Sequence, residues 1–193
     1  MITAIILAAG ESKRMGQPKM LLPWGNGTVL TRVISVFQNS GLTDIIVITG
    51  GVRDEVERLV SKQNVKTVHN SEFASGGMLS SIQCGLSVLT RQTQGALIGL
   101  GDQPQVREGS VRMVCDSFEE TTSNIVVPSY QMKRGHPWLV ARSLWDELLK
   151  METPESPRDF LNKHRHEIHY VNVDDPNILA DLDTPEEYKK WRP

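Results

Sequence analysis

The residues best suited to chemistry lie near the amino terminus, between positions 9 and 19. This stretch reads Ala-Gly-Glu-Ser-Lys-Arg-Met-Gly-Gln-Pro-Lys and carries two glycines, Gly10 and Gly16; of its cations, Arg14 and Lys19 are the two candidates for binding a ligand. Glycines let a ligand approach the backbone closely, and the two cations attract negative charge. The combination favours a polyanion, of which a nucleoside triphosphate is the simplest. An ordinary connection between a strand and a helix, with surface cations, is the alternative.

Two aspartates are candidates for holding a divalent cation. Asp102 follows an apolar segment and precedes Gln-Pro, and Asp183 lies in the sequence Asp-Leu-Asp-Thr-Pro-Glu-Glu at 181–187. Mg²⁺ takes one or two carboxylates together with phosphate oxygens and water, so both side chains have the right chemistry. Each also has a structural interpretation, because aspartate forms turns and caps helices.

The composition limits the class of protein. The chain has 193 residues, 39% of them hydrophobic and 23% charged, with a net charge of -2. We expect one globular domain over residues 1–193, without the basic surface that a nucleic-acid polymer would need. Cys84 and Cys115 lack the spacing of a zinc site or a disulfide framework, which favours reduced thiols in a cytoplasmic protein. No apolar run reaches the roughly 18 residues of a membrane span.

The hydrophobic pattern predicts the elements that must position these residues. Uninterrupted aliphatic runs are typical of strands covered on both faces, and they occur at 2–8, 44–49, 95–101 and 124–128, with a weaker run at 65–69. Helical spacing of apolar residues follows most of them, at 28–40, 53–62, 79–90 and 108–120. This alternation predicts right-handed crossovers and a mostly parallel sheet between helices, an α/β/α arrangement of three layers.

The carboxyl-terminal third is predicted to continue with shorter elements. A polar loop at 129–137 precedes strands at 138–140 and 167–173, helices at 142–150 and 157–163, and a last helix that opens with a capping box from Thr184 to Glu187. The glycine-rich turn at 25–27 can close a hairpin. Loops that leave the carboxyl ends of parallel strands share one edge of the sheet, where open α/β folds bind ligands.

Three motifs together resemble those of one enzyme family. Leu7-Ala8-Ala9-Gly10-x-Ser12-x-Arg14-Met15-Gly16-x-Pro18-Lys19 resembles the signature loop of the molybdenum-cofactor guanylyl- and cytidylyltransferases. Gly101-Asp102-Gln103-Pro104 resembles the metal-binding motif of that family, and residues 181–187 resemble its carboxyl-terminal signature. With a fourth motif, Gly135-His136-Pro137, they occur in family order, and the resemblance extends from residue 2 to about residue 188.

The resemblance implies a Rossmann-like nucleotidyltransferase and a role for each matched residue. It implies Mg²⁺-dependent transfer of a nucleotidyl group from a nucleoside triphosphate to molybdopterin or the molybdenum cofactor, with release of pyrophosphate. Arg14 and Lys19 would hold the pyrophosphate, and Asp102 and Asp183 the metal. The residues expected to bind the nucleotide are Leu7, Ala8, Ala9, Gly10, Ser12, Arg14, Lys19, Asn70, Ser81 and Gly101. Gly135, His136 and Pro137 resemble the motif beside the second substrate, although a structural role for the histidine stays open.

The branch of the family is indicated by small differences in these motifs. The guanylyl branch tends to have Leu-Ala-Gly-Gly where this chain has Leu-Ala-Ala-Gly at 7–10, so we predict CTP over GTP. A GTP-using guanylyltransferase and a sugar-1-phosphate nucleotidyltransferase are alternatives. From a different class, the chain could be a non-catalytic factor that binds the cofactor and delivers it to a recipient molybdenum hydroxylase such as a purine dehydrogenase.

Overall fold

The computed structural model describes residues 1–193, and its centre is an eight-stranded sheet. Its strands are β1 (Ile2–Ala8), β4 (Ile45–Thr49), β5 (Lys66–His69), β6 (Gly95–Leu100), β7 (Ile125–Tyr130), β8 (Lys133–Arg134), β9 (Trp138–Ala141) and β10 (Ile168–Asn172). They lie in the order β10-β7-β9-β6-β1-β4-β5, with β8 paired to β7. Strands β6, β1, β4 and β5 are parallel neighbours, and so are β7 and β10, which confirms the predicted mostly parallel sheet.

Strand β9 is the exception that shapes one side of the molecule. It lies between β6 and β7 and runs antiparallel to both, with Trp138 opposite Ile98 near the end of β6. An antiparallel strand starts at the edge where its neighbour ends. The segment 135–137, which precedes β9, is therefore brought to the same edge as the loop that follows β6.

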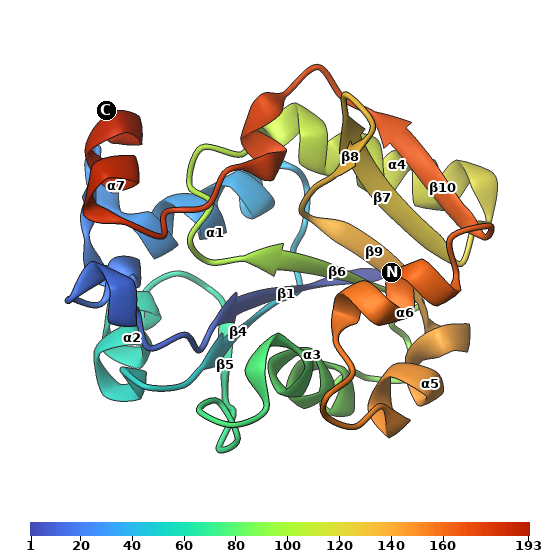
Figure 1. Cartoon of the computed structure of the whole chain (residues 1–193), viewed down its shortest axis with the longest axis horizontal. Coiled ribbons are helices and arrows are strands. Elements are labelled where there is room, and N and C mark those ends of the chain that lie inside the picture. Colours follow the sequence, from blue (N-terminus) through green and yellow to red (C-terminus); the bar gives the residue numbers. More distant parts are fainter.

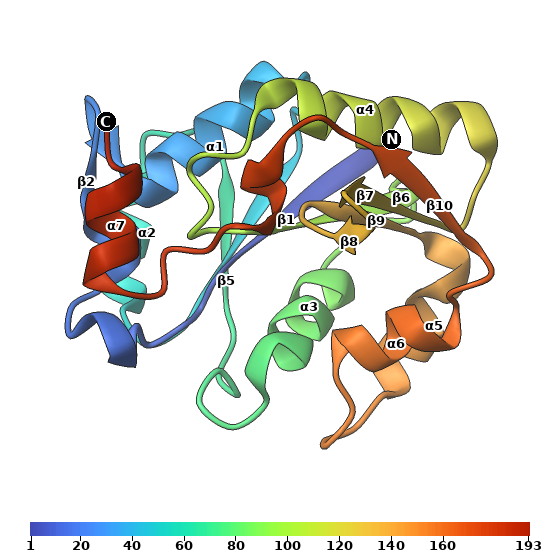
Figure 2. The ribbon, with the colours of Figure 1, turned by 45° about the horizontal axis from the view of Figure 1, so that its top comes forward.

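Helices cover both faces of this sheet, as Figures 1 and 2 show. On β1, Ala4, Ile6 and Ala8 pack into one core with α1 (Val29–Asn39), α2 (Arg53–Val60) and α4 (Glu108–Thr121). The alternate residues Ile5 and Leu7 pack into a second core with α3 (Gly77–Ser87), α5 (Trp145–Lys150) and α6 (Pro157–Lys163). Burial on both faces explains why the strands lack a polar side, and it confirms the three layers.

Local signals predicted the helix starts well. Thr28 caps α1 in a capping box with Thr31, and Thr184 does the same with Glu187 at the start of α7 (Pro185–Trp191). The predicted helix at 142–150 begins instead as a 3₁₀ turn, Arg142–Leu144, before α5. The predicted helix at 79–90 begins earlier, at Gly77, and ends at Ser87.

The predicted loop at 129–137 is partly a hairpin. Strand β7 continues to Tyr130, turns through Gln131 and Met132, and returns as β8. Both turn residues have positive φ, 48° and 63°, which matches the tight hairpin turns that suit twisted strands. Neither residue is a glycine or asparagine, so the usual sequence signal for this turn was absent. The predicted hairpin at 25–27 is confirmed as β2 (Pro23–Trp24) and β3 (Gly27–Thr28).

The remaining short elements are 3₁₀ turns, at Lys13–Met15, Lys19–Leu21 and Pro176–Leu179. The first two shape the loop after β1, and the third precedes the carboxyl-terminal motif. None of the helices combines the length and the hydrophobicity that crossing a membrane requires.

Candidate active site

The loop after β1 is folded back so that Lys19 faces the edge of the sheet. Ser12 and Gly16 adopt left-handed backbone conformations, with φ of 54° and 67°. The Ser12 hydroxyl accepts a hydrogen bond from the backbone N–H of Lys19 at 3.1 Å. Met15 is buried between these points and anchors the loop in a small core with Trp24. The two ends of the loop are thereby held together, and the Lys19 side chain starts from a defined position.

Four of the predicted site residues meet at this edge. The Lys19 ammonium contacts Asp102 Oδ2 and lies 3.0 Å from Asp183 Oδ1. Arg14 Nη2 donates to Asp183 Oδ2 at 2.7 Å. The side chains of Lys19 and Asp102 are only 12% and 13% exposed, whereas that of Arg14 is 72% exposed. The site therefore has a largely buried ion pair at its base and a solvated cation at its mouth.

Backbone contacts bring the two aspartates together, although 81 positions separate them in sequence. The N–H of Gly101 donates to the Leu7 carbonyl at 2.9 Å, and a Cβ atom at Gly101 would lie 3.0 Å from that same oxygen. On the other side of the site, the N–H of Leu182 donates to the Asp102 carbonyl at 3.3 Å. The Leu182 side chain is fully buried in the core that also holds Met15. The close approach at Gly101 and the anchoring of Leu182 place both carboxylates beside the loop.

The charges of the cluster shift the pKa values of its members. Burial opposes the charged form of Lys19, but Asp102 and Asp183 outweigh it and raise the pKa of the ammonium. Burial likewise opposes the ionised form of Asp183, but Lys19 and Arg14 lower the pKa of that carboxyl. Asp181 differs, because its burial and the nearby Asp102 raise its pKa, while Gln103 donates to it at 2.7 Å. Three carboxylates thus share one cavity with two cations.

The donor set suits Mg²⁺ when part of the coordination comes from the substrate. No three His, Cys, Asp or Glu side chains form a ready cluster of metal ligands. Asp102 and Asp183 nevertheless both contact the same ammonium, so positive charge is stabilised at one point between them. Carboxylate oxygens match a hard cation, which would complete its shell with phosphate oxygens and water.

A cavity of about 370 Å³ opens beside this cluster. It is lined by most of the residues predicted to bind a nucleotide, namely Leu7, Ala9, Gly10, Arg14, Lys19 and Ser81, together with the two predicted metal ligands, Asp102 and Asp183. It is also lined by Met20, Phe73 and Leu100, which the sequence patterns did not single out as ligands. Asp181 of the carboxyl-terminal motif and Gly77 and Met78 at the start of α3 complete the lining. A polar motif does not reveal the apolar walls of a site, which come from distant elements.

Four predicted residues lie behind the cavity surface. Ala8 points to the opposite face of the sheet, and Ser12 and Gly101 shape the two loops described above. Asn70 is 4% exposed, and its Nδ2 donates to Ser81 Oγ at 3.0 Å and to the neighbouring serine hydroxyl at 2.9 Å. Asn70 therefore acts on the cavity by orienting Ser81 at the start of α3.

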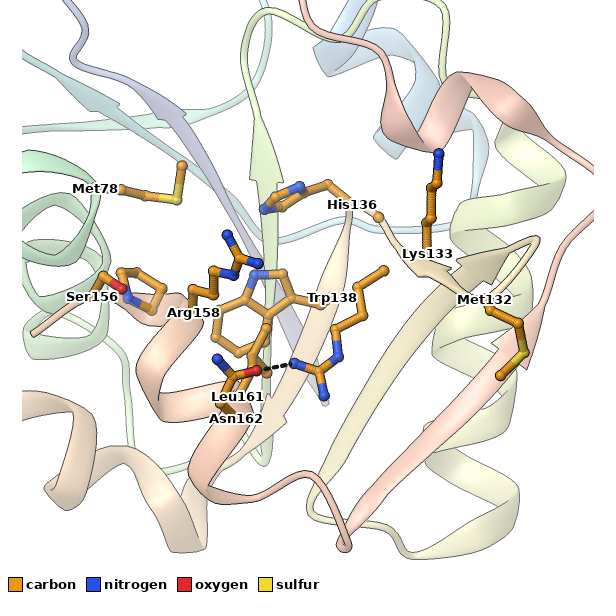
Figure 3. A pocket seen from close by; sticks show the side chains of 12 residues that line it. Met78, Met132, Lys133, His136, Trp138, Ser156, Arg158, Leu161 and Asn162 are labelled. Atoms are coloured by element: carbon orange, nitrogen blue, oxygen red, sulfur yellow. Dashed lines mark hydrogen bonds between the residues drawn. The ribbon is translucent and has the colours of Figure 1, made fainter.

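A second, larger cavity of about 710 Å³ adjoins the first through Met78, which lines both. Gly135 and His136 line it, as Figure 3 shows for the histidine, whereas Pro137 is buried beneath its surface. The desolvated surroundings lower the pKa of His136 to about 4, so its imidazole is neutral near pH 7. Trp138, 1% exposed, closes the base of the cavity.

Comparison with known proteins identifies the family. Residues 4–168 match the MobA-like NTP transferase domain. The chain is a MobA-like NTP transferase. The predicted resemblance and the predicted enzyme class, a nucleotidyltransferase, are both confirmed.

Relatives of this MobA-like NTP transferase carry names from both branches. It is 30% identical to the molybdenum cofactor cytidylyltransferase of Escherichia coli, over 97% of this chain and 93% of that protein. It is 26% identical to a probable molybdenum cofactor guanylyltransferase of Bacillus cytotoxicus, over 97% and 94%. Among solved structures, Rv0371c of Mycobacterium tuberculosis is 28% identical and superimposes with a TM-score of 0.86 over 98% of this chain and 96% of that one. The same protein is known in complex with manganese, with a TM-score of 0.83.

Proposed function

We propose that this chain, acting as a single domain, transfers CMP from CTP to molybdopterin or the molybdenum cofactor, with Mg²⁺ and release of pyrophosphate. The product would serve the maturation of a molybdenum hydroxylase. One observation carries the proposal: a cluster of Arg14, Lys19, Asp102 and Asp183 lines one cavity, and a second cavity adjoins it directly. Such a pair of cavities suits a reaction between two bound substrates, in which positioning supplies much of the rate.

In this mechanism the first cavity holds the triphosphate. Lys19 and Arg14 bind the oxygens that become pyrophosphate, where negative charge grows as the bond breaks. Asp102 and Asp183 would hold Mg²⁺, which when bound offsets the charge of the phosphate oxygens. Ser81, oriented by Asn70, would contact the nucleoside. Protein groups supply charge and orientation, and no covalent intermediate with the protein is needed.

The second cavity would hold the acceptor beside the α-phosphorus. An oxygen of the acceptor's terminal phosphate attacks the α-phosphorus of CTP, and a new P–O bond forms. The bond between that phosphorus and the oxygen bridging to the β-phosphate breaks, and pyrophosphate leaves with the bonding electron pair. The neutral imidazole of His136 can donate one hydrogen bond to the acceptor and accept another.

The choice of CTP is supported by the Leu-Ala-Ala-Gly sequence at 7–10 and by the higher identity to the cytidylyltransferase than to the guanylyltransferase. The measurement is pyrophosphate release by the purified chain with Mg²⁺ and molybdopterin, with CTP and GTP compared in separate reactions. We expect CTP to be preferred. Pyrophosphate release from GTP but not from CTP would assign the chain to the guanylyl branch instead. Pyrophosphate release only with sugar phosphates as acceptors would mean that the acceptor is a sugar phosphate and not molybdopterin.

An Asp102→Ala variant separates the enzyme from a non-catalytic delivery factor. We expect the variant to lose turnover by about 100-fold or more, because Asp102 lies against Lys19 at the base of the site. A protein that only binds the cofactor and hands it to a hydroxylase would keep its full effect on hydroxylase activation. Asp174→Ala, at an exposed position of the same chain, is the matched control.

A further inference from the structure

The segment of residues 175–183, between β10 and α7, contacts the linings of both cavities. Asp181 and Asp183 line the first cavity. A few positions earlier, Ile178 contacts Gly135 and His136, which line the second cavity. Figures 1 and 2 show this segment passing from β10 on one side of the molecule to α7 on the other. The carboxylate of Asp183 is therefore carried by a segment that residues of the second cavity also hold.

Gly135 lets this segment approach closely. Its backbone is not in the left-handed region that favours glycine, yet a Cβ atom there would lie 2.6 Å from the Ile178 carbonyl oxygen and 2.7 Å from two side-chain atoms of Ile178. The Ile178 side chain is fully buried in a close-packed core, so it has no space to move away. The next residue, His136, donates its backbone N–H to the same carbonyl at 3.0 Å. The absence of a side chain at position 135 is therefore explained by the 175–183 segment.

The loop after β6 holds the same segment through two glutamine amides. Gln103 is 3% exposed, and its Nε2 donates to Asp181 Oδ1 at 2.7 Å. Gln105 Nε2 donates to the Ala180 carbonyl at 2.5 Å, while the Oε1 of the same amide is buried without a hydrogen-bond partner. An unpaired buried oxygen costs stability, so Gln105 makes this contact at a cost that an apolar side chain would not have. The two amides fix positions 180 and 181, just before Asp183.

The start of the segment is fixed independently, by α4. Asp175 is 2% exposed, and its Oδ2 accepts from the Ser110 hydroxyl at 2.8 Å and from the backbone N–H of Arg107 at 3.3 Å. Arg107 precedes α4 and gives it no side-chain cap of its own, so Asp175 fills that role from a distant part of the chain. Because this end is held, a push on Ile178 displaces the segment toward its other end, where Asp183 lies.

We propose that Gly135 and Gln103 are positioning residues of the metal site, which together set the place of the 175–183 segment and so the distance between Asp183 and Asp102. This inference rests on the proposed function, in which the two aspartates hold Mg²⁺. It gives Gly135, which belongs to a motif expected beside the second substrate, a role on the metal side of the site. Removing contacts that orient metal ligands typically lowers metal affinity by about 10–100-fold.

The first test is metal binding without turnover. Mn²⁺ is titrated against the full chain, alone and with CTP, and the unbound ion is measured by its EPR signal. We expect Gly135→Ala and Gln103→Leu each to weaken Mn²⁺ binding about tenfold or more. Gly109→Ala is the matched control and should bind Mn²⁺ like the wild type, because a Cβ atom at Gly109 meets nothing within 4 Å. Unchanged Mn²⁺ affinity in either variant, or a wild type that binds no Mn²⁺ with or without CTP, would overturn the inference.

The second test separates positioning of the metal site from an acceptor contact and from a general effect on stability. In turnover with CTP and molybdopterin, we expect both variants to need about tenfold more Mg²⁺ for half-maximal activity. At saturating Mg²⁺, KM for the acceptor should be unchanged. A raised acceptor KM in Gly135→Ala with an unchanged Mg²⁺ requirement would mean that this glycine contacts the acceptor, and a lower melting temperature alone would mean a structural role. Either result would overturn the inference. If Gly135→Ala does not fold, Gln103→Leu decides both tests.

Metal binding also distinguishes a failure of this inference from a failure of the proposed function. If the wild type bound Mn²⁺ and both variants bound it more weakly, but no acceptor led to pyrophosphate release, the inference would stand and the proposed function would fall. An active wild type together with unchanged Mn²⁺ affinity in the variants would leave the proposed function standing and remove the inference.

Discussion

The most informative single change is Asp183→Asn. Asparagine keeps the size of the side chain and one oxygen acceptor, but it removes the charge that Lys19 and Arg14 share at 3.0 and 2.7 Å. The proposed role of Asp183, holding Mg²⁺ with Asp102, depends on that charge. A role limited to joining the carboxyl-terminal segment to the loop after β1 depends on it much less.

The structure sets the expected cost in stability. Arg14 is 72% exposed, so its pair with Asp183 contributes less than about 1 kcal/mol. Lys19 keeps its contact with Asp102 in the variant, so its ammonium is not left alone. Together we expect a loss of about 1–2 kcal/mol, which lowers the melting temperature by about 2–8 °C in a chain of this size.

The expected cost in activity is larger. Losing a charged group that acts on the triphosphate and its metal should lower kcat/KM about 100-fold or more, equivalent to about 3 kcal/mol or more. The assay is pyrophosphate release with CTP and molybdopterin over a range of Mg²⁺ concentrations, beside thermal unfolding of the same samples. We also expect the variant to need more Mg²⁺ for half-maximal activity.

The control is Asp174→Asn, the same chemical change at an exposed position of the same carboxyl-terminal region. It should leave both turnover and melting temperature unchanged. A variant at Asp183 that loses stability but keeps kcat/KM and its Mg²⁺ requirement would refute the assignment of Asp183 as a metal ligand.

Two further predictions concern groups behind the cavities. The imidazole of His164 contacts Glu147 and Glu167 at 3.0 Å each; burial alone would lower its pKa, but the two carboxylates outweigh it and raise the pKa. The stabilisation by His164 is therefore complete below the ordinary histidine pKa of about 6.5 and is lost as pH rises through the raised pKa. We expect the melting temperature of the wild type to exceed that of His164→Gln most at pH 6 and least at pH 9. A difference that stays constant with pH would contradict this. Asn70→Ala removes the donor that orients Ser81, so we expect a loss of about 1–3 kcal/mol in chemical denaturation and a higher KM for CTP. An unchanged KM for CTP would mean that Ser81 keeps its position without Asn70.

Local chemistry explains why much of the fold was predictable. The aliphatic run at 2–8 has no polar side because helices cover both of its faces, and the capping residues Thr28 and Thr184 satisfy backbone groups within their own turns. Each of these signals depends on residues a few positions apart. Strand order depends instead on contacts across the whole chain, so the antiparallel placement of Trp138–Ala141 between β6 and β7 could not be predicted from that segment.

The same distinction between local patterns and long-range contacts applies to the candidate site. The sequence by itself determined the cationic loop, the carboxylate after β6 and the acidic carboxyl-terminal motif, because each is a short pattern of residue types. Only the tertiary structure decided that Lys19 lies against both Asp102 and Asp183. Lys19 and Asp183 are 164 positions apart in the sequence. It also decided that Arg134 and Arg158 face one cavity that contains no carboxylate. The type of a side chain sets the charge it can carry, but whether that charge is compensated depends on the elements that pack around it.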